Sequence, residues 1–169
     1  MDDATKNLFE VVISIAQTVG IAIGALWAYF RFWREGIHRP RIEFDIQCAF
    51  LGTQGNASVV SFTVLANNKG NVEHRCSRVS LRVRGITTDQ TLARRPDARL
   101  DFPKSLLKAE LVPEGFGYYF VRPGIAQPFT FTTTIPADAR FLLARAAFKY
   151  ENSEDLHTSE RVFEVPRAA

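Results

Sequence analysis

The sequence predicts a mainly β protein in which one N-terminal helix precedes an antiparallel β-sandwich. An unbroken apolar run occupies residues 11–30, and from residue 41 onward apolar and polar residues alternate in successive stretches. Alternation with a period of two places every second side chain on one sheet face, as in half-buried strands. We therefore divide the chain into a helical segment at 1–34, with its span at 11–30, a linker at 35–40 and a sandwich at 41–169.

The apolar run has the length of a membrane span. Its 20 residues, rising about 1.5 Å each, cover roughly 30 Å, which matches the hydrocarbon thickness of a bilayer. A cleaved signal peptide is the alternative. It fits less well, because the run is longer than the apolar core of such peptides and Asp2, Asp3 and Glu10 outnumber Lys6 before and at its start. We expect an uncleaved, single-pass anchor.

Aromatic and basic residues gather at the C-terminal end of this run. Amphipathic rings favour the headgroup layer, and an excess of Lys and Arg marks the cytoplasmic flank of a span. We therefore expect an inner-membrane protein with its N-terminus outside and its C-terminal domain in the cytoplasm. The residues predicted to lie at the membrane interface are Trp27, Tyr29, Arg31, Trp33, Arg34, Arg39 and Arg41.

Small residues recur at every fourth position of the span, at Ala16, Gly20, Gly24 and Ala28. A helix face without large side chains lets two backbones approach closely, and dispersion with weak Cα–H to carbonyl contacts then favours association. The stripe predicts a homo-oligomer formed through the helix. The alternative, that glycine and alanine are simply frequent in membrane helices, stays open.

The strands follow in order along the chain. In the first, residues 41–50, Ile42, Phe44, Ile46, Cys48 and Phe50 share one face. Pro136 ends the fifth strand, because proline cannot donate to the ladder, and the last two strands form a hairpin. The remaining six predicted strands contain Val60 to Val64, Val79 to Val83, Phe116 to Phe120, Phe129 to Ile135, Phe141 to Tyr150 and Thr158 to Val165. About seven short antiparallel strands indicate an immunoglobulin-like sandwich.

Two short motifs carry a resemblance. The turn Asn68-Lys69-Gly70 resembles the strand-ending turn of bacterial immunoglobulin-like adhesion and sandwich domains, and the run from Pro123 to Pro136 is similar to their penultimate strands. The resemblance covers roughly residues 41–165 and implies a fold more than a function. A single helix joined to a small domain also resembles single-pass effectors of bacterial anti-phage systems. The 16 arginines against 5 lysines fit a bacterium with GC-rich coding.

The longest irregular stretch runs from residue 87 to 115, and we expect a short helix at 103–110 within it, begun by Pro103. A connection of this length in a compact domain is often functional. Arginine offers a planar fork of donors that fits phosphate or carboxylate. The candidate ligand-binding residues are Arg78, Arg82, Arg84, Arg94, Arg95 and Arg99. The alternative is a solvated basic surface without a ligand.

Common catalytic motifs do not occur in the chain: there is no nucleophile elbow, P-loop, paired-cysteine motif or zinc-protease helix. We expect no enzyme, no catalytic residue and no cofactor. His74 and Cys76 share a strand face, but a strand cysteine is more often a small buried hydrophobe than a nucleophile. The stretch Glu151, Glu154, Asp155, His157 and Glu160 matches no metal-ligand spacing, so no metal is expected.

The charge balance limits the classes of partner to expect, and the cysteine content indicates the redox compartment. From residue 36 onward 18 Lys and Arg face 14 Asp and Glu, a mild excess that does not call for nucleic acid. Cys48 and Cys76 are expected to be unpaired thiols in a reducing compartment. The expected function is a membrane-anchored, non-enzymatic module whose cytoplasmic sandwich binds a protein or a small anionic ligand. The alternative is a membrane-disrupting effector, for example in anti-phage defence, activated by clustering of the helix.

Overall fold

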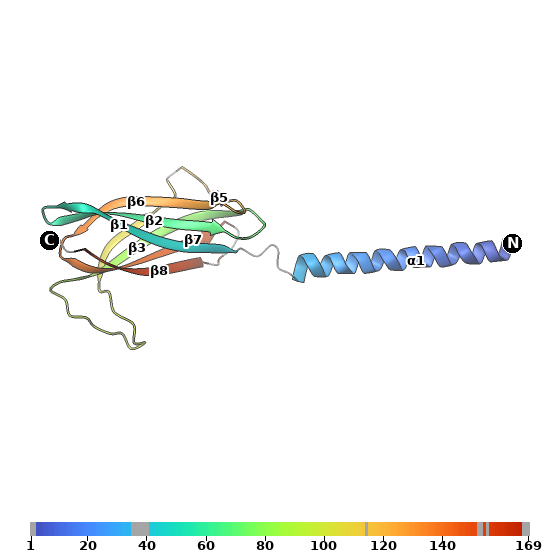
Figure 1. Cartoon of the computed structure of the whole chain (residues 1–169), viewed down its shortest axis with the longest axis horizontal. Helices are drawn as coiled ribbons and strands as arrows, with labels where there is room; N and C mark the ends of the chain where they lie inside the picture. The colour runs from blue at the N-terminus through green and yellow to red at the C-terminus, as the bar shows by residue number, and fades with distance from the viewer. Residues whose placement is uncertain (1–2, 35–40, 114, 152–153, 155, 167–169) are drawn as a thin grey trace. The chain divides into compact units, whose positions relative to one another are not determined.

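The structure, a computed structural model, describes residues 3–34, 41–113, 115–151, 154 and 156–166 (Figure 1). The chain divides into two compact units, Met1–Arg39 and Pro40–Ala169. The first contains helix α1, Asp3–Tyr29, which continues into a short π-helical segment, η1, Phe30–Arg34. Residues Lys6–Phe32 are long and apolar enough to cross a membrane.

The second unit is an antiparallel β-sandwich, which confirms the predicted mainly β fold with one N-terminal helix. The smaller sheet has the strand order β1-β2-β6, and the larger has the order β4-β3-β7-β8, with β5 also paired to β3. The described residues form eight strands, where the sequence predicts about seven. They are β1 Ile42–Gln54, β2 Ala57–Asn68, β3 His74–Thr87, β4 Lys104–Glu110, β5 Tyr119–Val121, β6 Ala126–Pro136, β7 Ala139–Tyr150 and β8 Leu156–Glu164.

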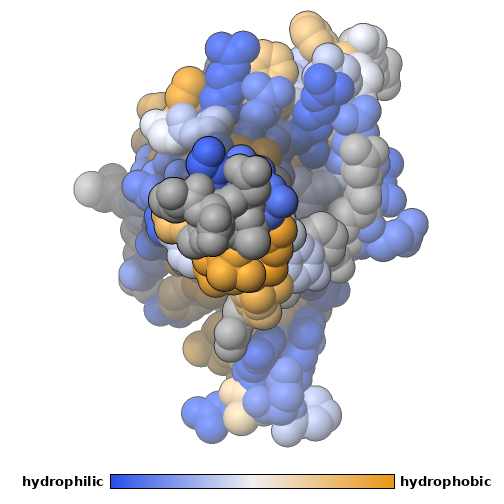
Figure 2. Space-filling model, turned by 90° about the vertical axis from the view of Figure 1, so that its right-hand side faces the viewer, coloured by the Kyte–Doolittle hydropathy of each residue, from blue (hydrophilic) through white to orange (hydrophobic). Residues whose placement is uncertain are grey.

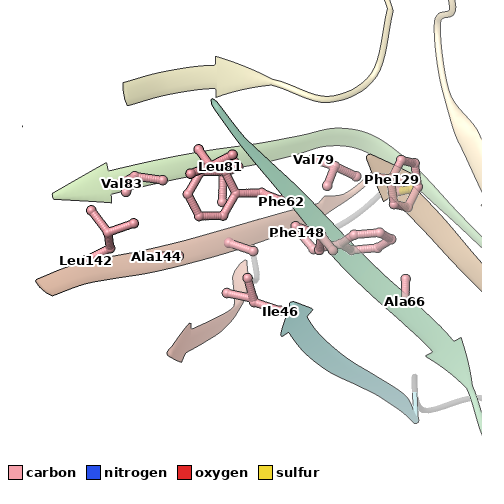
Figure 3. Close-up of a cluster of buried hydrophobic side chains, with 14 of the residues drawn as sticks. Ile46, Phe62, Ala66, Val79, Leu81, Val83, Phe129, Leu142, Ala144 and Phe148 are labelled. Carbon is pink, nitrogen blue, oxygen red and sulfur yellow. The ribbon is translucent and has the colours of Figure 1, made fainter. Parts of the chain in front are cut away.

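The core lies between the two sheets and includes most of the inward side chains predicted from alternation (Figure 3). Ile46 and Phe62 from the smaller sheet and Leu81 and Phe148 from the larger are fully buried. Burial alternates strictly along β2, which pairs with β1 on one side and β6 on the other. The pattern follows from the pleat, which sends successive side chains to opposite faces of a strand.

The expected helix at 103–110 is wrong, because this stretch forms strand β4 on the edge of the larger sheet. Lysine, leucine, alanine and glutamate favour helix only weakly as single residues, and tertiary context overrides such a preference. Here β3 supplies unpaired backbone groups along its edge, and β4 hydrogen-bonds to them from Gly85 opposite Lys104 to Ser80 opposite Glu110. The half-buried Leu106 and Leu107 also pack against the core.

The expected strand at Phe116, Tyr118 and Phe120 is also corrected. Strand β5 spans only three residues, and these three aromatic side chains are exposed. Pairing with β3 sets Tyr119 opposite Cys76 and Val121 opposite His74. A shift of one residue exchanges the two faces of a strand, so the alternate set, Tyr119 and Val121, faces inward.

Candidate anion-binding site

A cavity of about 410 Å³ lies on the outer face of the larger sheet. Five cationic side chains line it, together with one carboxylate, Glu160, and three neutral residues. The cations come from β3, β4, β7 and the segment between β3 and β4, and they are Arg82, Arg84, Arg95, Lys108 and Arg145. We call this cavity the cationic groove. A space of this size with four positive charges in excess suits an anion.

Strand register explains how the positive charges meet. Arg82 on β3 lies directly opposite Lys108 on β4 and, on its other side, directly opposite Arg145 on β7. Arg145 in turn lies opposite Glu160 on β8. Like charges directly opposite one another destabilise a sheet. The row Lys108, Arg82, Arg145 is therefore a local electrostatic cost to the fold.

Ion pairs offset only part of this charge. Arg145 Nε lies 3.4 Å from Glu160 Oε1, and Arg95 Nε lies 2.9 Å from Asp101 Oδ1. Among the residues that the structure describes, no acidic partner is paired with Arg82, Arg84 or Lys108. Their donors are available to a ligand that approaches from solvent.

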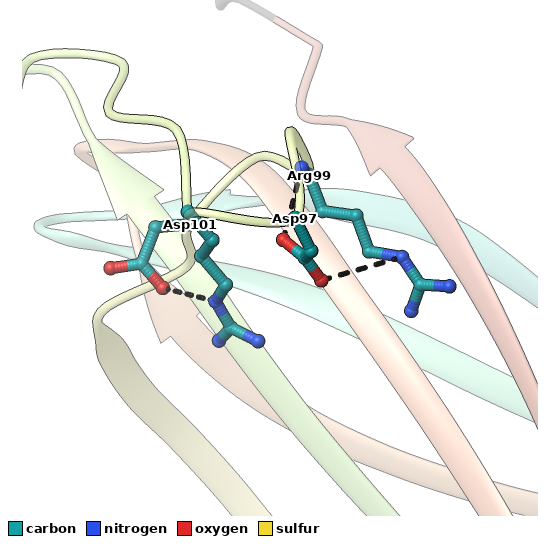
Figure 4. Close-up of polar contacts among 4 residues, drawn as sticks. Asp97, Arg99 and Asp101 are labelled. Carbon is teal, nitrogen blue, oxygen red and sulfur yellow. Dashed lines mark hydrogen bonds and ion pairs between the residues drawn. The ribbon is translucent and has the colours of Figure 1, made fainter.

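The segment between β3 and β4 is an excursion that carries Asp97, Arg99 and Asp101 (Figure 4). Arg95 of the same segment lines the groove. Within the excursion, Arg94 and Leu100 form an isolated antiparallel β-bridge. At its tip, Arg95 N–H donates a hydrogen bond to Arg99 O at 2.8 Å. Phe102, exposed by only 2%, anchors the base of the excursion. The guanidinium of Arg95 keeps one bond to Asp101 and has further donors in its fork.

The predicted ligand residues thus fall into two groups. Arg82, Arg84 and Arg95 come together in the cationic groove, whereas Arg78, Arg94 and Arg99 do not line it. Arg78 pairs with Glu110 at 3.4 Å, and Arg99 pairs with Asp97 at 3.7 Å.

Two cations of the groove were missed from the sequence. The sequence predicts a helix at Lys108, and a helix has no strand register that could set Lys108 opposite Arg82. Arg145 lies within a largely apolar strand, but it alternates with Ala144 and Ala146, and this period-two position indicates an outward side chain.

His74 and Cys76 do not form a base and thiolate pair. The Cys76 thiol donates to the carbonyl oxygen of Tyr119 at 3.2 Å, and burial raises its pKa to about 12, so it stays protonated at neutral pH. Burial, followed by the charge of His157, lowers the pKa of His74. His157 instead meets the hydroxyl of Tyr150, with Nδ1 at 3.0 Å from Oη.

Of the acidic stretch, Asp155 lies outside the described residues. Among the residues that are described, no three His, Cys, Asp or Glu side chains are arranged to hold a metal ion. Cys48 and Cys76 are both free thiols.

The predicted interface and helix residues are placed only in part. Arg31 lies over the ring of Trp27, 5.2 Å from its centroid, and Tyr29 meets the ring of Phe30 at 5.9 Å. Gly20 and Gly24 have open space where a side chain would stand. Arg41 is exposed. The side chains of Trp33, Arg34 and Arg39 lie outside those the structure describes.

No family model and no curated protein matches the chain. Among solved structures, it is similar to the sporulation control protein Spo0M of Bacillus subtilis, with 13% identity and a TM-score of 0.48, over 75% of this chain and 50% of that one. It is also similar to the ApaA protein of Bordetella pertussis, with 12% identity and a TM-score of 0.47, over 76% of this chain and 97% of that one. The chain thus spans about half of the Spo0M structure. At such identities and scores, these neighbours carry no information about what this chain binds.

Proposed function

We propose that the protein is a membrane-anchored binding module whose immunoglobulin-like sandwich lies in the cytoplasm and binds a multiply charged anion in the cationic groove. The row formed by Lys108, Arg82 and Arg145 carries this proposal. A ligand with two or more negative charges, such as a nucleotide or a sugar phosphate, would convert the repulsion within this row into attraction. Such a ligand would also accept hydrogen bonds from Arg82 and Arg84, which have no acidic partner among the described residues.

The size and chemistry of the groove support a small organic anion over a bare ion. Ligand pockets for small molecules measure roughly 300 to 1,000 Å³, and the groove measures about 410 Å³. The side chains of Leu107 and Leu143 add apolar wall between the cations, which would contact the carbon skeleton of such a ligand. The guanidinium forks of Arg82, Arg84 and Arg145 match the geometry of phosphate and carboxylate.

The helix supports the membrane part of the proposal. It is long and apolar enough to span a bilayer, and the arginines that follow it favour a cytoplasmic C-terminal flank. Only seven residue steps separate Arg34 from Arg41, which limits an extended linker to about 25 Å. The binding module would therefore act close to the inner surface of the membrane.

Calorimetric titration of the full-length chain, in an uncharged detergent, tests the binding proposal. The probes are tripolyphosphate, adenosine triphosphate and, as a monovalent comparison, acetate. We expect the polyanions to bind and acetate to give no measurable heat. Because a hydrogen bond to a charged group contributes about 1.5 to 3 kcal/mol, Arg82→Gln should weaken polyanion binding roughly tenfold or more.

Arg140→Gln is the matched control, since Arg140 is exposed on the same strand as Arg145 but does not line the groove. Unchanged affinity in this variant with a clear loss in Arg82→Gln would support the groove as the binding site. Equal affinity in both variants, or no binding of any polyanion, would remove the proposed ligand class.

A further inference from the structure

Exposed apolar side chains of the sandwich concentrate at one end. This end carries the start of β1, the turns at 69–73 and 122–125 and the approach to β5, and we call it the Arg41 end. Its large exposed side chains are Phe116 (60% exposed), Tyr118 (41%), Phe120 (45%), Ile125 (47%) and Leu156 (57%). Figure 2 colours the molecule by hydropathy and shows orange hydrophobic residues beside blue hydrophilic ones on the face toward the viewer.

A hydrogen-bond network fixes these segments relative to one another. The N–H of Asn68 donates to Ile125 O at 3.2 Å, and Gly124 N–H donates to Asn68 O at 2.8 Å. The next residue, Lys69, donates its N–H to Arg41 O at 2.8 Å. Backbone hydrogen bonds from Asn68 and Lys69, at the end of β2, thus hold both the apolar Ile125 and the cationic Arg41 at this end of the sandwich.

Arginine side chains are interleaved with the exposed rings. Arg75 Cζ lies 4.6 Å from the ring centroid of Tyr118, and Arg122 Cζ lies 5.1 Å from that of Phe120. Arg122 also pairs with Glu73 at 3.4 Å. Arg41, Lys69 and Arg75 have no ion pair among the described residues. The turn between β7 and β8 at the same end carries the exposed Glu151, whose N–H donates to Arg75 O at 3.0 Å, and the exposed Glu154. The Arg41 end therefore combines aromatic rings with unpaired cations and with carboxylates.

We infer that the Arg41 end docks onto the anionic surface of the bilayer in which the helix is anchored, with its exposed rings in the headgroup layer. This inference rests on the membrane anchor of the proposed function and is independent of the groove. Aromatic side chains favour the membrane interface. The short linker limits how far the Arg41 end can lie from that surface, and anionic headgroups attract the unpaired cations.

The two tryptophans of the chain, Trp27 and Trp33, both lie in the helical segment, so the sandwich can carry a single reporter. In a Trp27→Phe/Trp33→Phe background, Ile125→Trp places the reporter at the Arg41 end. Leu92→Trp is the matched control, because Leu92 is 61% exposed on the excursion at the opposite end. Phe120→Trp is a second reporter that conserves an aromatic ring, should Ile125→Trp perturb the fold.

The full-length variants are reconstituted into nanodiscs of phosphatidylcholine and phosphatidylglycerol, with and without lipids that carry a doxyl quencher near the headgroup. We expect the fluorescence of Ile125→Trp and Phe120→Trp to be quenched, and that of Leu92→Trp to be unchanged. Adding Arg75→Gln should reduce the quenching, because each basic residue near the surface contributes roughly a fivefold bias to docking. Nanodiscs of phosphatidylcholine alone should reduce it further.

Two negative results separate the inference from its premise. Incorporation into nanodiscs with equal fluorescence in all three reporters would overturn the docking while leaving the anchor intact. Failure of the full-length chain to incorporate would overturn the anchor and the docking together, whereas polyanion binding in the groove would still be measurable. Quenching at the Arg41 end that persists in phosphatidylcholine alone would overturn the role assigned to the cations.

Discussion

The side-chain amide of Asn68 donates a hydrogen bond to the carbonyl oxygen of Val121, 2.9 Å away and 53 residues later in the chain. The same amide donates to Val72 O at 2.8 Å, and its Oδ1 accepts from Gly70 N–H at 2.9 Å. Asn68 is fully buried. One side chain thus connects the end of β2, in the smaller sheet, to the turn that follows it and to β5, in the larger sheet.

Asn68→Ala should lower the free energy of unfolding by about 2 to 4 kcal/mol, because buried groups left without a hydrogen-bond partner cost about 1 to 3 kcal/mol each. Equilibrium unfolding in urea measures the loss. Asn67→Ala is the control, since Asn67 is half-buried on the same strand and makes no side-chain hydrogen bond among those that the structure describes. A similar loss in both variants would contradict the bridging role of Asn68.

Arg82→Thr should stabilise the fold while it weakens anion binding. The substitution removes the central charge of the row between Lys108 and Arg145. Each like-charged cross-strand pair destabilises a sheet by roughly 0.2 to 1 kcal/mol. Urea unfolding at low salt should show the gain, and high salt should reduce it by screening. Arg78→Thr should give no such gain, because Arg78 is paired with Glu110. Destabilisation by Arg82→Thr at low salt would show that the row is not repulsive.

Stability should fall as the pH drops below about 6.5, the ordinary pKa of histidine. Burial lowers the pKa of folded His74, so between its folded and unfolded pKa values the unfolded chain binds more protons. Stability then rises with pH in that window and is lost as the pH falls through the folded pKa. The titratable groups beside His74 are His157 and Tyr150. Burial raises the pKa of Tyr150 to about 12.

His74→Phe should flatten this pH dependence, measured by urea unfolding across a pH series. It should leave stability at neutral pH unchanged or slightly higher, because Nε2 of His74 is buried without a hydrogen-bond partner among the described residues. His157→Phe is the comparison, and it should lower stability at neutral pH because it removes the bond to Tyr150. An unaltered pH profile in His74→Phe would assign the acid sensitivity to other groups.

The full-length chain should form a defined oligomer in mild detergent, and Gly20→Leu/Gly24→Leu should reduce it to a monomer. Both glycines are open to an approaching helix, and leucine side chains would hold two backbones apart. Cross-linking or mass photometry measures the change, with Ile21→Leu/Ile23→Leu as a control on other faces of α1. Toxicity on expression that disappears in the glycine variant would favour the alternative effector function. A monomer in the unaltered chain would remove helix association.

Local patterns in the sequence predicted much of this architecture. The apolar run predicted α1, and period-two alternation predicted the inward side chains of β1, β2, β3 and β6, because the pleat alone assigns alternate residues to opposite faces. The same rule placed Arg82 and Arg84 on an outer face before any pairing was known. The turn at Asn68 was also expected, although its bond to Val121 was not.

Pairing between distant strands decided the rest. Residues 104–110 have no strand pattern strong enough to exclude a helix, and they became β4 only because β3 had a free edge to bind them. Pairing with β3 likewise reversed the expected face of Tyr118 and Phe120. The cationic groove depends on register, since Lys108 and Arg145 meet Arg82 only when two strands align beside β3. Side-chain direction is a local property of the chain, whereas register depends on which distant backbone groups form hydrogen bonds, and only the tertiary structure specifies that choice.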